Sequence, residues 1–272
     1  MRLTARDLNP LHVAGRLRRK LLRLAMRPLF REHAERLAGL RDRHRGERCV
    51  IIGNGPSLAH MDLTPLEHDI TFGANALFLH YDTMGFRPTY YTVADGVGAE
   101  DRADEINALT GSVKLIPQDL VYCIRPGPDV IYFPYDRSHD RFPSFARDAS
   151  RVVYWGSSVT YIQMQLAYHM GIRTVYLIGC DFEYTIPDGV KELDIVSQGP
   201  DPNHFHPDYH GKGYRWVRPR FDRMETAFRL AREAFEADGR RIINATPGGK
   251  LEVFPRQSYD ELIRSPKEEQ RE

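Results

Sequence analysis

A run of mostly β-branched residues at positions 49–52, Cys-Val-Ile-Ile, ends abruptly in the glycine-containing stretch Gly-Asn-Gly-Pro-Ser at 53–57. A short apolar run bounded by glycine predicts a strand that is buried on both faces, as in a parallel sheet. Further candidate strands follow at 70–72, 90–93, 113–116, 130–133, 151–154, 174–178 and 241–243.

Helical patterns separate several of these runs, at 99–109, 158–170 and 222–237. Strands that alternate with helices favour βαβ units. We therefore expect an α/β fold with a mostly parallel, Rossmann-like sheet, in one domain over residues 49–255. The polar residues at the end of 256–272 are expected to form a frayed C-terminal tail.

The N-terminal residues 1–48 differ from the rest in charge. They hold fourteen Lys or Arg and five Asp or Glu residues, an excess of nine positive charges, whereas the whole chain carries +1 and the remainder therefore −8. This balance argues against a protein that binds nucleic acid. Leucines near helical spacing predict a basic helical arm over 14–45, interrupted at Pro28. The arm is either a packing or dimerisation helix or an interfacial helix on an anionic membrane.

The three cysteines, Cys49, Cys123 and Cys180, are odd in number and form no CxxC motif, which is typical of a reducing compartment. No apolar run reaches the length of a membrane span. Arginines recur too often near the N-terminus for a signal peptide. We expect a cytoplasmic protein, at the inner face of the membrane if the arm binds lipid.

Gly53, Asn54, Gly55 and Ser57 directly follow the first predicted strand. Glycines at this edge of a parallel sheet let the backbone turn and present its N–H groups to an anion. However, Leu58 occupies the third glycine position of a GxGxxG fingerprint, and the lysine of a P-loop is missing. A nucleotide contact and an ordinary tight turn are both consistent with this stretch.

Polar residues follow other predicted strands or open the helix near 158 at the same edge. They are Asn75, Asp95, Ser157, Ser158 and Asp181. Each has a purely structural alternative, because Asn, Asp and Ser commonly cap helices and turns. Their recurrence at one edge predicts that they line a single cleft.

The stretch 184–220 is long, irregular and rich in Gly and Pro, and it carries His204, His206 and His210. Long irregular segments in compact domains are commonly lids or binding loops. A histidine suits a general base because its unperturbed pKa lies near neutrality. The alternatives are structural histidines, or ligands of a zinc-like metal, for which the chain offers no regular partner motif elsewhere.

Taken in order, these segments resemble the bacterial sialyltransferases of glycosyltransferase family 42. The resemblance is carried by IIGNGPSL at 51–58, FGANALF at 72–78 and YWGSSVTYIQMQLAYHMGIRTVYLIGCDF at 154–182, followed by the histidine segment. The same segments resemble the domain shared by motility-associated nonulosonate transferases and archaeal 6-hydroxymethylpterin diphosphokinases. The covered residues are 49–255.

The resemblance implies a Rossmann-like fold with a lid, and catalysis that needs no metal. It assigns Asn54 and Asn75 to a cytidine nucleotide, and Ser157 or Ser158 to a place near the donor. It also implies that a lid histidine is the general base. His206 and His210 keep the spacing of two family histidines, whereas His204 keeps the preceding Asp-x-Asn context.

The chain departs from the sialyltransferase pattern at two positions. Asp95 stands where those enzymes have Asn, and Glu183 stands where they have a tyrosine, with Tyr184 following it. We expect Tyr184 to contact the nucleotide instead. A carboxylate at Glu183 repels the departing phosphate unless it is protonated or turned away.

The leading hypothesis is a glycosyltransferase that moves a sialic-acid-like sugar from a CMP-activated donor to a glycan hydroxyl, as in bacterial surface polysaccharides. A lid histidine would take the acceptor proton. The alternative is pyrophosphoryl transfer from ATP, which requires Mg²⁺ held by Asp95, Asp181 and Glu183. The third possibility is a nucleotide-binding scaffold without activity, and a homo-oligomer is compatible with each.

Overall fold

In the computed structural model, residues 21–186 and 194–265 are described, and they build one seven-stranded sheet with smaller additions. Every neighbouring pair in this sheet is parallel. The order across the sheet is β11 (Arg241–Asn244), β8 (Thr174–Ile178), β1 (Arg48–Ile52), β2 (Ile70–Ala74), β3 (Tyr90–Thr92), β4 (Val113–Pro117) and β5 (Val130–Phe133). The predicted Rossmann-like α/β fold is thus confirmed, and the strand order reverses between β1 and β8.

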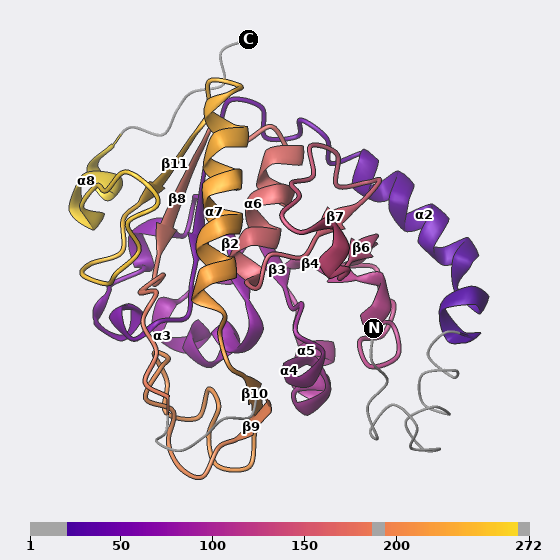
Figure 1. Ribbon diagram of the computed structural model, residues 1–272, viewed down its shortest axis with the longest axis horizontal. Helices are drawn as coiled ribbons and strands as arrows, with labels where there is room; N and C mark the ends of the chain where they lie inside the picture. The colour runs from indigo at the N-terminus through magenta and orange to yellow at the C-terminus, as the bar shows by residue number, and fades with distance from the viewer. Residues whose placement is uncertain (1–20, 187–193, 266–272) are drawn as a thin grey trace.

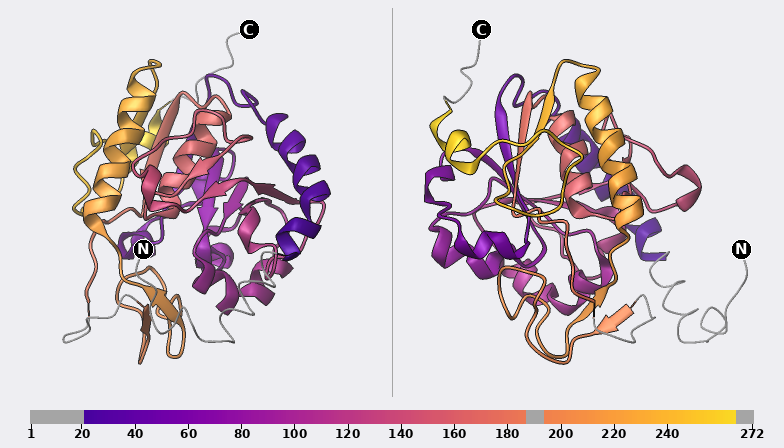
Figure 2. Two further views of the ribbon diagram at one scale, coloured as in Figure 1. Left: turned by 45° about the vertical axis from the view of Figure 1, so that its right-hand side comes forward. Right: turned by 60° about the vertical axis from the view of Figure 1, so that its left-hand side comes forward.

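Helical segments cover both faces of the sheet (Figures 1 and 2). The long helices α6 (Val159–His169) and α7 (Phe221–Glu236) pack on the face that carries Cys49 and Ile51. The opposite face carries Val50 and Ile52 and is covered by shorter segments. These are the 3₁₀ helices η2 (Pro56–His60), η3 (Thr64–Leu66) and η4 (Asn75–His80), with α3 (Tyr81–Met84) and α8 (Tyr259–Arg264). Strand β1 is therefore buried on both faces, as its apolar run predicts.

Two predicted elements differ in the structure. The helix expected over 99–109 is divided into α4 (Gly96–Asp101) and α5 (Ala103–Ala108), because Arg102 leaves helical geometry at φ −121°. The run 151–154 contributes only β7 (Val153–Tyr154), which pairs with β6 (Tyr135–Asp136) outside the main sheet. The side-chain amide of Gln165 on α6 bonds the N–H and the C=O of Tyr154, so a side chain takes the place of a strand neighbour.

The basic arm predicted over 14–45 is shorter than expected, and its residues 14–20 lie outside the described part. A helical segment at 21–25 is interrupted at Met26, two residues before Pro28, close to the predicted position. Helix α2 (Arg27–Ala38) follows and stops well before residue 45. It stops there because the chain then bonds to the end of α6, with the Asp42 N–H donating to the His169 C=O.

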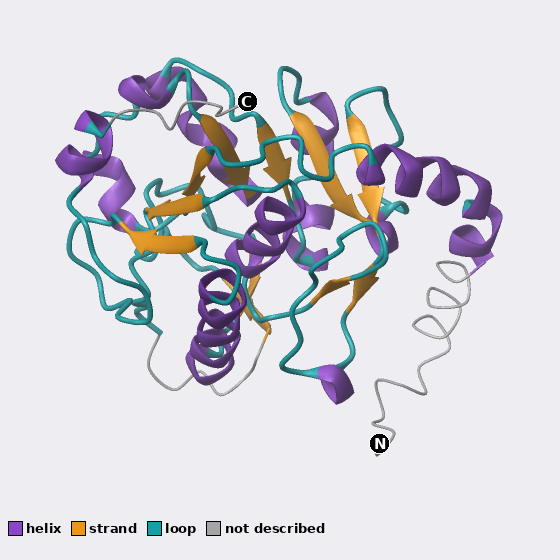
Figure 3. Cartoon of the chain, turned by 90° about the horizontal axis from the view of Figure 1, so that it is seen from above, coloured by secondary structure: helices purple, strands orange, loops and turns teal. Residues whose placement is uncertain are grey.

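Helix α2 lies along β5, at one end of the row of strands (Figure 3). His33 Nδ1 accepts the Tyr132 N–H at 2.9 Å, and Arg36 donates to the Val130 C=O at 2.9 Å. These bonds satisfy polar groups that a sheet edge would otherwise expose. Leu37 and Leu40 are buried in the main core. Residues 27–48 thus pack as part of the body, and the expected division of the chain after residue 48 is not a boundary of packing.

The described part of the predicted lid is a loop region that contains an antiparallel pair, β9 (Asp194–Val196) and β10 (Arg215–Val217). Residues 187–193 of the lid and 266–272 of the tail lie outside the described residues. The remaining short elements are η5 (Gln118–Leu120) and η6 (His139–Arg141). Over the residues described, no helix is both long and apolar enough to cross a membrane.

Candidate active site

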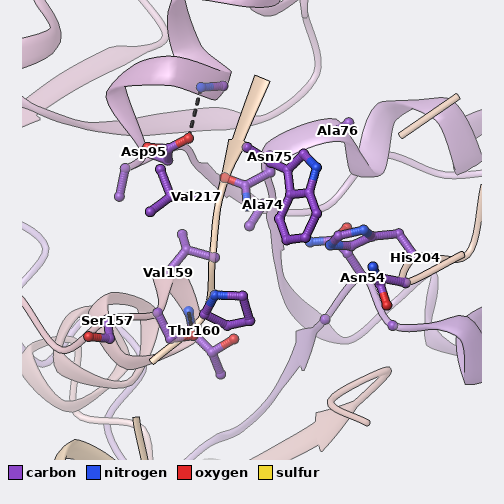
Figure 4. Close-up of a pocket in the computed structure, with 18 of the residues that line it drawn as sticks. Asn54, Ala74, Asn75, Ala76, Asp95, Ser157, Val159, Thr160, His204 and Val217 are labelled. Atoms are coloured by element: carbon purple, nitrogen blue, oxygen red, sulfur yellow. Dashed lines mark hydrogen bonds between the residues drawn. The ribbon is translucent and has the colours of Figure 1, made fainter. Parts of the chain in front are cut away.

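A cleft of about 350 Å³ lies at the carboxyl ends of the central strands, within the size range of small-molecule sites (Figure 4). Its walls come from the turns after β1, β2, β3 and β8, from the start of α6, and from the lid. The residues that the sequence places at this edge and that line the cleft are Gly53, Asn54, Gly55, Asn75, Asp95, Ser157, Ser158, Asp181 and Tyr184. The prediction that the strand-end residues share one cleft is therefore confirmed.

The two glycines after β1 serve the packing of the sheet edge. The Gly53 N–H donates to the Ile178 C=O at 2.7 Å, and the Gly55 N–H donates to the Gly179 C=O at 2.8 Å. A Cβ on Gly53 would lie 2.2 Å from the Gly179 oxygen, so the turns after β1 and β8 meet more closely than any side chain permits. The expectation that these N–H groups face an anion is wrong, because they are already bonded within the protein.

Ser57 and Asp181 hold the same two turns together. The Ser57 hydroxyl donates to Asp181 Oδ2 at 2.8 Å, and the Ser57 N–H donates to Oδ1 at 3.2 Å. Ser57 is not among the residues that line the cleft. Its expected contact with a nucleotide is replaced by a bond to Asp181, whose carboxylate is engaged at the start of η2.

Asp95 and Ser158 act as helix caps, the alternative that the sequence left open for each. Asp95 accepts the N–H groups of Val97 and Gly98 at the start of α4. The Ser158 hydroxyl accepts the Thr160 N–H at the start of α6. Both residues line the cleft, but their side-chain oxygens already have partners.

Three other polar side chains in the cleft have buried atoms that find no hydrogen-bond partner among the residues described. These atoms are Asn54 Oδ1, Asn75 Oδ1 and Ser157 Oγ. Asn75 and Ser157 also adopt left-handed backbone angles, with φ 51° and 61°. Such strain costs about 1–3 kcal/mol per residue and clusters at ligand sites, as do buried polar atoms left unsatisfied. The strain and the unpaired atoms together make this part of the cleft a candidate ligand-binding surface.

His204 of the lid forms a buried pair with Asp201. Its Nδ1 lies 2.7 Å from Asp201 Oδ2, and the side chains of His204 and Asp201 are 7% and 3% exposed. Its Nε2 lies 3.1 Å from the Tyr184 hydroxyl, and its ring stacks on Tyr209 at a centroid distance of 3.8 Å. An imidazole oriented by a carboxylate through Nδ1 has the arrangement of a general base.

The ionisation of the neighbours fits that arrangement. Burial opposes the ionisation of Asp201, but the hydrogen bond and the charge of His204 outweigh it and hold the Asp201 pKa below its usual value. Burial raises the pKa of Tyr184, so its hydroxyl stays protonated. With Asp201 ionised, His204 donates from Nδ1, and a neutral His204 then accepts at Nε2.

The other two lid histidines occupy different positions. His210 lines the cleft, and its backbone N–H donates to Asp201 Oδ2 at 2.9 Å. Burial and the charge of His204 hold the His210 pKa well below its usual value, so its ring is neutral. His206 does not line the cleft, and its Nδ1 accepts the Asp208 N–H instead. His206 therefore lies outside the cleft, and its assignment as a catalytic residue is wrong.

The carboxylates that were expected to hold Mg²⁺ do not form a set. Asp95 caps α4, Asp181 binds Ser57, and Glu183 lies 2.6 Å from the ammonium of Lys250. Among the described residues, the group able to hold a metal is Asp201, His204 and His210, with ligand atoms within 4.8 Å of one another. Two imidazoles and one carboxylate suit a zinc-like ion better than Mg²⁺, which prefers oxygen.

The residue that fastens the lid, Arg102, was not anticipated from the sequence. It is buried, donates to the C=O groups of Asp208 and Tyr209, and lies over the ring of Tyr214 at 4.2 Å. The sequence offers one indirect indication of a special role for Arg102, which is that the residue falls within the helix expected over 99–109 and interrupts it. Arg102 thereby ties the histidine segment of the lid to the helices after β3.

Comparison with known proteins identifies the family of this chain. The model of a family described as 6-hydroxymethylpterin diphosphokinase MptE-like matches residues 27–187, which start at α2 and end before the lid histidines. A solved structure of a MAf glycosyltransferase from Magnetospirillum magneticum AMB-1 is similar over 85% of this chain, at 14% identity and a TM-score of 0.49. The chain spans only 38% of that protein. A search of curated proteins finds no match. On the family match, which covers more than half of its length, the chain belongs to the MptE-like family.

Proposed function

We propose that the protein is a glycosyltransferase that moves a sugar from a CMP-activated donor to a hydroxyl of a glycan acceptor. The observation that carries the proposal is the buried Asp201–His204 pair, whose imidazole lines the same cleft as the unpaired atoms of Asn54, Asn75 and Ser157. One part of the cleft then supplies a base, and another supplies polar contacts for a nucleotide.

His204 Nε2 takes the proton of the acceptor hydroxyl as that oxygen attacks the anomeric carbon. The acceptor replaces the Tyr184 hydroxyl, which now occupies the hydrogen bond at Nε2. Asp201 stabilises the imidazolium that results. The bond from the anomeric carbon to the CMP oxygen breaks, and its electron pair leaves with the phosphate.

Glu183 presents less of an obstacle to this chemistry than its sequence position suggests. Its carboxylate is paired with Lys250, which offsets the negative charge near a departing phosphate. The pair is more than half exposed, so we count it as screening of that charge and not as a source of affinity. We propose that protein groups alone stabilise the leaving phosphate and that no metal cofactor is required.

Pyrophosphoryl transfer from ATP is the second candidate, and the family match favours it. That chemistry normally requires Mg²⁺ on the polyphosphate. Asp95, Asp181 and Glu183, the oxygen ligands nominated for it, have partners in the protein. Because these three carboxylates already have partners, we rank glycosyl transfer first.

Calorimetric titration with CMP, CTP and ATP, each with and without Mg²⁺, separates the candidates. The proposal expects CMP to bind equally well in EDTA and in Mg²⁺. Binding of ATP that depends on Mg²⁺, without binding of CMP, would support the diphosphokinase. If the protein binds none of these nucleotides, the result would support the third possibility, a scaffold without activity.

We further propose that the basic N-terminal segment contacts an anionic membrane surface. Leu21 and Leu24 are exposed and lie beside Arg23 and Arg27, an interfacial pattern. Flotation with phosphatidylglycerol vesicles tests this. We expect the unaltered protein to float with the vesicles and the double variant Leu21→Asp/Leu24→Asp to lose this binding. Equal flotation of the two proteins would contradict the proposal.

A further inference from the structure

Three arginines of the lid line the cleft, and they differ in their partners. Arg215 on β10 pairs with Asp101 and Glu100 of α4. Arg220 pairs with Asp222 at the start of α7. Arg218 lies between them in sequence, lines the same cleft, and has neither a hydrogen bond nor an ion pair with any residue that the structure describes.

The other cations of the cleft are also engaged. Arg102 donates to the Tyr209 C=O and pairs with Glu105. Arg137 pairs with Asp119 and donates to the Ala94 C=O at 2.7 Å. Within the described residues, Arg218 is therefore the arginine of the cleft wall whose charge is not met by the protein.

Arg218 is only partly exposed, and in such surroundings a guanidinium binds an anion more strongly than it does in open water. Its fixed fork of donors matches a phosphate better than a single ammonium does. Two acids that line the same cleft, Asp95 and Asp181, are held by backbone N–H groups and by Ser57. Among the described residues no acid therefore neutralises Arg218, so its charge can act on a bound ligand.

We propose that Arg218 binds the phosphate of the nucleotide and neutralises the charge that develops on it when the donor bond breaks. This inference rests on the proposed function. As the bond between the anomeric carbon and the CMP oxygen breaks, the electron pair adds negative charge to the phosphate, and the acceptor proton goes to His204. Arg218 meets that charge from the wall of the cleft.

The test compares CMP with cytidine, which lacks the phosphate, by calorimetry in EDTA. Arg218→Ala should weaken CMP binding about 10–100-fold and change cytidine binding less than about twofold. Arg218→Lys should recover part of the loss. The control is Lys212→Ala, a lid cation that is exposed and outside the cleft, which should leave both affinities unchanged. Equal melting temperatures show that the variants are folded.

Three outcomes overturn the inference: unchanged CMP binding in Arg218→Ala, an equal loss for CMP and cytidine, or the same loss in Lys212→Ala. Failure of the unaltered protein to bind CMP is a separate result, because it refutes the proposed function. The same variants are then titrated with ATP and adenosine in Mg²⁺. If Arg218→Ala weakens the binding of ATP but not of adenosine, Arg218 still binds a phosphate. Any other pattern of affinities would remove this assignment.

Discussion

Two parts of the cleft edge are built in opposite ways. In the first, which we term the glycine junction and define as Gly53, Gly55 and Gly179, backbone N–H groups bond to neighbouring turns, and small residues allow a close approach. The second is the polar wall of Asn54, Asn75 and Ser157. Its buried side-chain atoms have no partner within the described part of the chain, and two of its residues hold left-handed backbone angles. The region that most resembles a nucleotide-binding motif is thus satisfied by the protein itself.

The difference shows why a glycine-rich turn after a strand is weak evidence for a ligand. Glycine permits close contact with any backbone, whether of the protein or of a phosphate group. Strained non-glycine residues with unpaired polar atoms have no such structural explanation, and they are better evidence for a site. The following variants are chosen to test whether the two parts behave as differently as their geometry indicates.

The largest effect is expected at His204, the proposed base, which lies beside Asn54 in the cleft (Figure 4). His204→Ala should lower turnover about 10²–10⁴-fold while CMP affinity changes little, because the base acts in the transition state. The same substitution at His206, outside the cleft, is the control and should cost far less. Single-turnover rates, measured with saturating donor and with the enzyme in excess over the acceptor, give the difference. Equal rates for the two variants would remove His204 from the mechanism.

The glycine junction should respond in stability. Gly53→Ala places a methyl group against the backbone of Gly179 and is expected to lower the free energy of unfolding by about 1–3 kcal/mol. The matched control is Gly199→Ala, since a Cβ at Gly199 meets nothing within 4 Å. Urea denaturation measures both. If Gly53→Ala unfolds at the midpoint of the unaltered protein, the junction is not tightly packed.

Acid should destabilise the protein through His210. Its folded pKa lies well below its usual value, whereas the unfolded side chain takes up a proton near pH 6.5. The unfolded state therefore binds more protons as the pH falls below 6.5, and the free energy of unfolding decreases by up to about 2 kcal/mol by pH 5. His210→Gln should flatten this dependence in urea titrations at several pH values. His206→Gln, at the surface, is the control, and identical slopes for all three proteins would refute the assignment.

The smallest effect is a gain of stability in the polar wall. Ser157→Gly relieves a left-handed angle and should raise the free energy of unfolding by about 0.5–1 kcal/mol while weakening CMP binding. Asp42→Gly relieves a similar angle, φ 56°, away from the cleft, and should stabilise without a change in CMP affinity. If both variants bind CMP like the unaltered protein, Ser157 does not contact the nucleotide.

The sequence predicted the sheet well because each parallel strand is a short apolar run closed by turn residues, a local pattern. It did not predict that the run 151–154 stays out of the main sheet, since Gln165 satisfies Tyr154 from another element. It also could not separate α2 from a solvated arm. The contacts of His33 and Arg36 with β5 join residues far apart in the chain.

At the candidate site, sequence reasoning named the strand edge where the cleft lies and the lid histidines, but it gave no role to Asp201, Arg102 or Arg218. The roles proposed for these three depend on partners brought in by the tertiary fold, or on the lack of a partner in the described residues. The reverse holds for Ser57, whose position in the motif is typical of a phosphate contact and whose hydroxyl binds Asp181. Spacing along the chain cannot show which polar atoms the folded protein has already satisfied.

A crystal structure of the protein with CMP, grown in EDTA, tests the central claim most directly. We predict that CMP lies in the cleft with polar atoms within hydrogen-bond distance of the unpaired atoms of Asn54, Asn75 and Ser157. The Gly53 and Gly55 N–H groups should stay bonded to Ile178 and Gly179. A nucleotide held by those glycine N–H groups, or bound outside the cleft, would contradict the account.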